Sequence, residues 1–114
     1  MLKIGVDIED ISRFVDKSDE FLTRIFTDLE IQYCKSHKEY ASRFTARYCA
    51  KEAIVKALSG FGIKNIAYKD IEVFHDENKC PCARILKPIE KDLIINLSLS
   101  HEKEKAIAFV TIEA

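Results

Sequence analysis

Glu52 and Lys56 lie one helical turn apart in the segment RYCAKEAIVKALSGFGI, among alanines and aliphatic residues. A carboxylate at the edge of an apolar core is costly unless it is paired, protonated or bound to a metal ion. The two residues could form an internal salt bridge, because an acid four residues before a base is the favoured orientation on a helix. From the spacing alone, this structural interpretation is favoured over a catalytic one.

Asp7 supplies the catalytic alternative. It lies near the end of LKIGVDI, whose alternating apolar and polar residues predict a strand. In so short a chain this strand must pack near the helix that carries Glu52. Asp7 and Glu52 could then hold a hard cation such as Mg²⁺, which prefers oxygen ligands and keeps several waters. Lys56 would face the phosphate group that the cation binds.

A possible anion site lies late in the chain. Ser100 and His101 end the segment NLSLSH, just before the charged turn EKEK. Backbone N–H groups and an imidazole at such a turn can receive an anion. A lone histidine at a strand end is usually a surface or capping residue, so this pattern alone identifies no function.

The elements that must position these residues predict an α+β fold. After the N-terminal strand, the sequence predicts short helices over residues 11–17 and 21–26. Thr27 and Glu30 have the spacing of a capping box, which predicts a helix from there towards His37. A long helix should begin near residues 40–42 and end at Gly60 or Gly62. Its alanines at positions 46, 50, 53 and 57 share one side, which would let another element approach closely.

Antiparallel strands are predicted for the C-terminal part. The segments DIEVFHD and CARILK could pair across the turn ENKCP. The segments LIINLSLSH and AIAFVTI are apolar or alternate cleanly, and the turn EKEK between them predicts a hairpin.

Composition restricts the classes of protein that fit. The chain has 114 residues and a formal net charge of −1, with 47% hydrophobic and 32% charged residues. These values predict one globular domain over residues 1–114 and argue against a protein that binds nucleic acid through bulk positive charge. No segment has the apolar length that crosses a bilayer, and the N-terminus lacks the apolar block of a signal peptide. We therefore expect a cytoplasmic protein with no membrane partner, and reduced thiols at its four cysteines.

Four segments occur together in an order and spacing that are typical of one known family: GVDIEDISRF, RIFTDLE, RYCAKEAIVKAL and LSLSHEKEKAIAFV. They resemble the holo-acyl-carrier-protein synthase family, the small bacterial 4′-phosphopantetheinyl transferases. The resemblance covers nearly the whole chain. An aspartate in G-x-D, a later A-K-E-A-x-x-K-A and a late S-x-S-H form a specific combination.

The resemblance implies a 4′-phosphopantetheinyl transferase fold and a Mg²⁺-dependent reaction. The phosphopantetheine arm of coenzyme A would pass to a serine of apo-acyl carrier protein, releasing adenosine 3′,5′-bisphosphate and supporting fatty acid and lipid biosynthesis. Asp7 and Glu52 would hold the metal, and Lys56 would steady the pyrophosphate and the departing phosphate. The serine proton would go to Glu52 or to a metal-bound water held by Asp7.

The resemblance also implies binding residues and partners. Arg47 and His101 are similar to positions that contact the nucleotide and phosphates of coenzyme A. Lys56 and Ser100 are also expected to bind coenzyme A. Arg13 matches an arginine that docks the acidic carrier protein, and Lys17 lies one turn further on the same side. A homotrimer is implied, with coenzyme A in the cleft between protomers. The turn ENKCP lacks the glycine usual in the family's G-K-P, so we expect a longer or differently shaped hairpin there.

Two other classes of function stay open. An early acid followed by E-x-x-x-K resembles some metal-dependent nucleases, although the sequence has no basic stripe. A non-enzymatic oligomerisation module would use the alanine-lined helix for assembly and the Glu52–Lys56 pair as a structural salt bridge. Both rank below the transferase.

Overall fold

The computed structural model describes residues 1–114, and it confirms the predicted order of an early strand, a helical middle and late antiparallel strands. The elements, including two short 3₁₀ helices (η), are β1 (Leu2–Asp10), η1 (Ile11–Phe14), α1 (Asp19–Thr23), α2 (Asp28–Lys35), α3 (Tyr40–Ser59), η2 (Tyr68–Asp70), β2 (Ile71–His75), β3 (Pro81–Ile85), β4 (Ile94–His101) and β5 (Lys105–Glu113).

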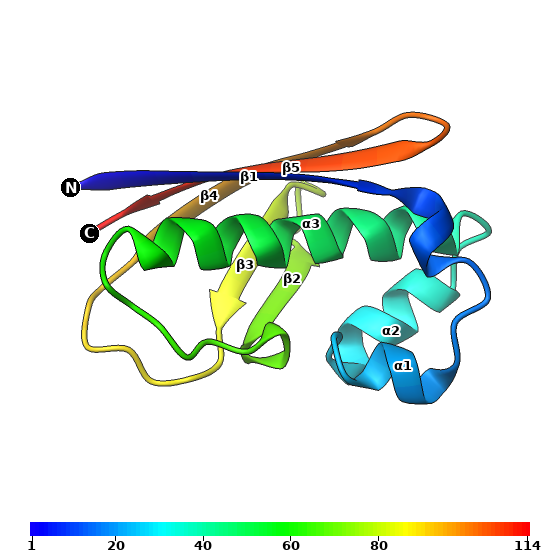
Figure 1. The fold of residues 1–114 in the computed structure, drawn as a ribbon, viewed down its shortest axis with the longest axis horizontal. Coiled ribbons are helices and arrows are strands. Elements are labelled where there is room, and N and C mark those ends of the chain that lie inside the picture. Colours follow the sequence, from blue (N-terminus) through cyan, green and yellow to red (C-terminus); the bar gives the residue numbers. More distant parts are fainter.

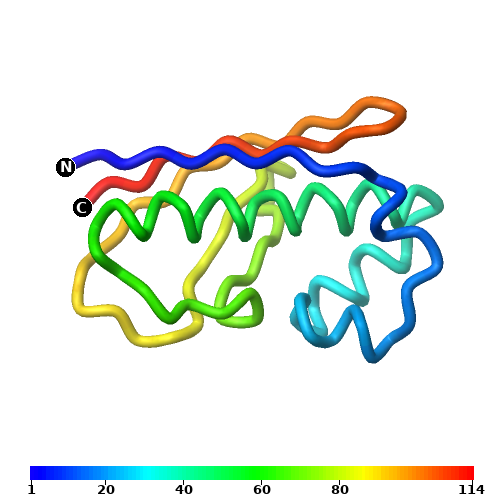
Figure 2. Tube along the Cα trace, viewed as in Figure 1, coloured from blue at the N-terminus to red at the C-terminus, as the bar shows by residue number.

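Two antiparallel sheets are formed. The larger has the strand order β1-β5-β4, so the first and last strands of the chain pair along their whole length, from Leu2 opposite Glu113 to Asp10 opposite Lys105. The two ends of the chain consequently lie side by side (Figure 2). The smaller sheet is the predicted hairpin of β2 and β3. In its turn, Lys79 adopts a left-handed conformation with φ of 62°, which glycine adopts most easily.

The long helix α3 lies along one face of the larger sheet (Figure 1). It contacts β1 at very short range: a Cβ atom placed on Gly5 would lie 1.9 Å from the carbonyl oxygen of Ala53. Ala50, Ala53 and Ala57 are buried here. The prediction that small residues on this helix admit a close neighbour is confirmed.

The opposite face of the same sheet is apolar but exposed. On β1 the predicted alternation is present, yet Gly5 faces α3 and the large apolar side chains face outward. Neighbouring residues of β5 and β4 continue this surface. The large apolar residues of this outer face are Leu2, Ile4, Val6, Ile8, Ile94, Ile107 and Phe109, with 37% to 62% of their surface exposed. Exposed apolar patches of this kind are typical of surfaces that contact other molecules.

A second apolar cluster lies where α1, α2 and η1 meet α3, and it contains Phe14, Leu22, Phe26, Cys34, Phe44 and Tyr48. The predicted capping box at the start of α2 is present, with the Thr27 and Glu30 side chains bonded reciprocally to each other's backbone N–H groups. Glu30 is also fully buried and lies 2.7 Å from the equally buried Lys51. The sequence analysis did not predict this ion pair, which ties α2 to α3.

Two helix predictions were imprecise. The element expected over residues 11–17 is only the 3₁₀ turn η1, because the chain turns out of helical geometry at Val15 and Asp16 has a positive φ of 54°. Helix α1 begins before the expected residue 21, because Ser18 caps the helix: its side-chain hydroxyl accepts a hydrogen bond from the Phe21 N–H group. None of the helices has both the length and the apolarity that a bilayer span requires.

Candidate active site

Asp7 and Lys56 meet between β1 and α3. The Asp7 side chain, on the helix-facing side of β1, is 12% exposed. The Lys56 Nζ atom donates to the Val6 carbonyl oxygen at 2.8 Å and lies 3.4 Å from Asp7 Oδ1. Lys56 therefore forms its ion pair across elements. The internal Glu52–Lys56 salt bridge considered from the sequence is not formed, because β1 presents both a carbonyl and a carboxylate to the ammonium group.

One oxygen of Asp7 lacks a partner. Its Oδ2 atom is buried and accepts no hydrogen bond. Burial raises the pKa of Asp7, and the hydrogen bond from Lys56 opposes that effect, while the negative charges of Glu9 and Glu52 raise the pKa further. A buried, unpartnered carboxylate oxygen among other acids is a suitable ligand for a hard cation.

The donor set around Asp7 fits Mg²⁺ on its chemistry. Asp7 and Glu52 offer oxygen ligands, and no cluster of three or more histidine, cysteine or acidic side chains is present. Two carboxylates leave coordination positions for water and for substrate oxygens, which is how Mg²⁺ is commonly held beside phosphates. The protein residues alone would not complete a closed metal cage.

Glu52 is half-buried on α3 and is held by two tyrosines. The phenol groups of Tyr48 and Tyr68 both donate to Glu52 Oε1, the first at 3.1 Å. Burial raises the pKa of each phenol, and the Glu52 contact raises it further for Tyr68, so both remain protonated donors at neutral pH. The sequence analysis missed both. Tyr48 precedes Glu52 by four residues, so helical spacing could have predicted this contact. Tyr68 lies on η2, and no local sequence pattern predicts that it contacts Glu52.

Arg13 lies beside Tyr48 and Glu9. Its guanidinium donates to Glu9 Oε1 at 2.9 Å and lies 4.7 Å from the centre of the Tyr48 ring. About half of its side-chain surface remains exposed. Lys17 is exposed near the Phe21 ring. The two predicted docking cations are thus accessible. Arg13 also contacts Tyr48, whose hydroxyl donates to Glu52.

Arg47 lies on the other side of α3. Five residues turn a helix by about 140° relative to Glu52, so the structure does not bring these two side chains together. Arg47 is buried, its Nη2 atom lies 3.2 Å from His75 Nδ1, and its guanidinium lies 4.3 Å from the centre of the Tyr33 ring. Its Nε atom has no partner and no carboxylate pairs with it. A buried cation without a counter-charge is suited to an anionic ligand.

Ser100 and His101 end β4, and only Ser100 lies on the side of the sheet opposite to Asp7. Both are exposed at the end of β4. By strand alternation Ser100 shares the outer face with Ile107, opposite to the side that Asp7 occupies. His101 lines a cavity of about 540 Å³ that also includes residues at the start of α3. A ligand that touches Asp7 and Ser100 would need two faces of the sheet, or two copies of it.

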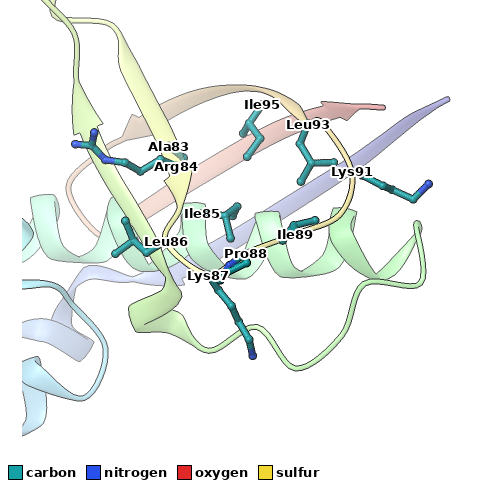
Figure 3. A pocket seen from close by; sticks show the side chains of 10 residues that line it. All are labelled: Ala83, Arg84, Ile85, Leu86, Lys87, Pro88, Ile89, Lys91, Leu93 and Ile95. Carbon is teal, nitrogen blue, oxygen red and sulfur yellow. The ribbon is translucent and has the colours of Figure 1, made fainter.

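Another large cavity lies away from these residues. It has a volume of about 510 Å³ and is lined by the end of β3, the following loop and the start of β4, including Ile85, Ile89 and Ile95 (Figure 3). None of the predicted site residues lines it and it contains no carboxylate. This cavity is therefore separate from the candidate site at the junction of β1 and α3.

Residues 3–110 match the family model described as the 4′-phosphopantetheinyl transferase superfamily. The holo-[acyl-carrier-protein] synthase of Halothermothrix orenii is 40% identical, over 94% of this chain and 93% of that protein. The corresponding synthase of Clostridium tetani is 38% identical, over 99% and 96%. The crystal structure of the Bacillus anthracis synthase in complex with CoA (3′,5′-ADP) has a TM-score of 0.82 and 32% identity, covering 98% of this chain and 96% of that one.

Proposed function

The chain belongs to the 4′-phosphopantetheinyl transferase superfamily, and we propose that it is a holo-acyl-carrier-protein synthase. It would transfer the phosphopantetheine arm of coenzyme A to a serine of apo-acyl carrier protein and release adenosine 3′,5′-bisphosphate. Residues 1–114 would form one transferase domain. The product would serve fatty acid biosynthesis in the cytoplasm, as the sequence resemblance implies.

The single observation that carries this proposal is the Asp7 carboxylate. It is nearly buried, it has an unpartnered oxygen, and it lies beside a lysine and a second acid. Folding stability alone does not favour such an arrangement, because a buried carboxylate oxygen without a partner costs free energy. A ligand that supplies positive charge would relieve that cost.

Each residue of the cluster has a role in the proposed reaction. Asp7 and Glu52 would hold Mg²⁺, which when bound would neutralise the diphosphate of coenzyme A and polarise the attacked phosphorus. Lys56 places a positive charge next to Asp7, where it would bind the diphosphate and stabilise the departing phosphate. Glu52 is also our candidate for accepting the proton that the serine hydroxyl loses.

Coenzyme A would extend beyond this cluster. Arg47 is a buried guanidinium without a counter-charge, and it would bind a phosphate of the nucleotide. Ser100 and His101 would contact the ligand from the end of β4. Because Ser100 lies on the face of the sheet opposite to Asp7, a complete site would need a second protomer.

The outer face of the β1-β5-β4 sheet supports a homotrimer. Its apolar side chains are exposed in the single chain, and covering them with copies of the same face would bury a substantial area. Ser100 shares that face, so it would lie at the contact between protomers. Arg13 and Lys17 stay accessible and would dock the acidic carrier protein.

The proposal is tested by incubating the protein with apo-acyl carrier protein, coenzyme A and Mg²⁺ and measuring the mass of the carrier. We expect the carrier to gain one phosphopantetheine group, and the gain to require the metal. Asp7→Asn and Glu52→Gln should reduce the rate at least a hundredfold, the order of magnitude lost when a charge-stabilising group is removed from a site. Asp10→Asn, on the same strand but in a surface pair with Lys105, is the matched control and should retain activity. An unmodified carrier with the wild-type protein would contradict the proposal.

The two rival functions have less support. The oligomerisation module required a structural Glu52–Lys56 salt bridge, and Lys56 pairs with Asp7 instead. The nuclease rested on a similarity of short motifs, whereas the family match covers residues 3–110.

A further inference from the structure

We propose that Tyr48 and Tyr68 are positioning residues that hold the Glu52 carboxylate in the orientation in which it binds the metal ion. This inference rests on the proposed function, since it takes Glu52 as a metal ligand. It assigns a role to two side chains outside the predicted site.

Both phenols bind the same oxygen of Glu52. Tyr48 and Tyr68 donate to Oε1, and no side chain or backbone group donates to Oε2. A carboxylate held through one oxygen by two donors has lost most of its rotational freedom, and its second oxygen stays available for a cation. Free glutamate side chains lose considerable rotamer entropy when they are fixed, so a preset carboxylate binds a cation with less of that loss.

Tyr68 is held in place by the buried ion pair. The Lys51 Nζ atom donates to the Tyr68 carbonyl oxygen at 2.8 Å and to the Ile71 carbonyl oxygen at 2.6 Å. Lys51 is fully buried and also contacts Glu30 at 2.7 Å. These bonds fasten the 3₁₀ turn η2 to α3 one residue before Glu52. The backbone of Tyr68 is therefore held against α3 while its phenol contacts Glu52.

Tyr48 is held by packing on both sides. Its ring centre lies 5.4 Å from that of Phe14 and 5.4 Å from that of Tyr68. The Arg13 guanidinium covers it at 4.7 Å. Tyr48 precedes Glu52 by four residues on α3, so the two side chains lie on the same face of the helix. Removal of either hydroxyl would leave the ring contacts in place and delete only the donor.

The experiment measures metal affinity in the full chain with Mn²⁺ as the probe, by the paramagnetic resonance signal of the free ion. Tyr68→Phe and Tyr48→Phe should each weaken Mn²⁺ binding about tenfold, the lower part of the range for residues that orient a metal ligand. The double variant should weaken it further. Tyr40→Phe, whose hydroxyl contacts Asp16 on the surface, is the matched control and should bind as the wild type does.

A second measurement separates positioning from packing. In the carrier-modification assay, the Mg²⁺ concentration for half-maximal rate should rise in Tyr68→Phe, while the rate at saturating Mg²⁺ returns to within about threefold of wild type. A packing role predicts a lowered melting temperature and a rate that added metal does not restore. Unchanged Mn²⁺ affinity in both tyrosine variants, or a rate defect that excess metal fails to restore, would overturn the inference.

Glu52→Gln distinguishes failure of the inference from failure of the proposed function. If Glu52→Gln loses Mn²⁺ binding and the tyrosine variants keep it, only the positioning role is wrong. If Glu52→Gln binds Mn²⁺ as tightly as wild type, or if the wild-type protein binds none, the assignment of Glu52 as a ligand is wrong and the positioning role falls with it.

Discussion

At the scale of single residues, the site is built from charges that do not fully compensate one another. Lys56 neutralises one oxygen of Asp7 and leaves the other without a partner. Arg47 carries a buried positive charge whose polar contacts are a histidine nitrogen and a backbone carbonyl, with no carboxylate among them. Both groups lower the stability of the free protein and would gain favourable interactions when a charged ligand binds. This pattern is expected of binding residues rather than of core residues.

Arg13 permits a prediction at this scale. Arg13→Ala should raise the KM for apo-acyl carrier protein about tenfold, equivalent to about 1.4 kcal/mol, because it removes an exposed cation that an acidic partner would meet. The KM for coenzyme A should change little. Steady-state assays that vary one substrate at a time check this.

The control for Arg13 is Lys91→Ala, an exposed cation in the loop between β3 and β4. It should leave both KM values unchanged. If Arg13→Ala altered only the KM for coenzyme A, the docking role would be wrong.

At the scale of elements, the position of Asp7 depends on how closely β1 approaches α3. That approach requires a residue without a side chain on the strand and alanines on the helix. Wider separation would move the Asp7 carboxylate away from Lys56 and Glu52. Packing at this contact is therefore a condition of the chemistry as well as of stability.

Gly5→Ala tests the contact. A methyl group there would lie 1.9 Å from the Ala53 carbonyl oxygen, which belongs to the backbone and cannot move aside. We expect a loss of about 3 kcal/mol or more in the free energy of unfolding, at the upper end for overpacking, measured by urea denaturation. Gly60→Ala is the control, because its nearest atoms belong mainly to the flexible Lys3 side chain. A fully stable Gly5→Ala protein would show that the two elements can separate without cost.

The attachment of the β2–β3 hairpin to α3 should depend on pH. Burial lowers the pKa of His75, and the nearby Arg47 and Arg43 charges lower it further. The unfolded chain therefore binds a proton at a higher pH than the folded chain does. Stability from this group is complete above about pH 6.5, the ordinary histidine pKa, and is lost as the pH falls through the folded value.

His75→Gln should weaken this dependence. Urea denaturation at pH 5.0 and 7.5 should show a smaller difference in unfolding free energy for the variant than for wild type. The neighbouring titratable and charged groups include His37 and Asp76. They are present in both the variant and the wild-type protein, so the comparison isolates His75. His101→Gln, at an exposed position, should preserve the wild-type difference. Equal pH dependence in His75→Gln and wild type would contradict the assignment.

At the scale of the whole molecule, the sheet has an apolar face on each side. One face is covered by α3, and the outer face carries exposed apolar residues such as Ile4 and Phe109. A single chain of this size buries a limited core, and association would stabilise it further. We therefore connect the oligomeric state with activity, since Ser100 lies on the outer face.

Phe109→Glu tests that connection. A carboxylate at the centre of the outer face would be costly to bury between protomers, so we expect sedimentation as a monomer and loss of transferase activity. Leu29→Glu, which charges an exposed apolar residue of α2, should keep the proposed trimer and its activity. Analytical ultracentrifugation, with transferase assays in parallel, checks the oligomeric state and the activity of both variants. An active monomer would exclude the shared cleft.

The sequence alone predicted most of the local elements and a set of candidate chemical residues. Helix α3, the capping box of α2 and the two late hairpins were predicted because periodicity, caps and turns act over a few residues. Short motifs with specific spacing led to the family, which the match over residues 3–110 confirms. The same motifs predicted that Asp7, Glu52 and Lys56 belong to one site, and the structure pairs Asp7 with Lys56.

Tertiary structure decided which groups those residues contact. Alternation along β1 predicted two faces, but only packing against α3 decided that the apolar one points outward. Helical spacing offered Glu52 as the partner of Lys56, and β1 supplied Asp7 instead. Tyr68 reaches Glu52 only because a buried lysine anchors η2 to α3. Each of these contacts joins residues far apart in the chain, and no local spacing records which distant groups will meet.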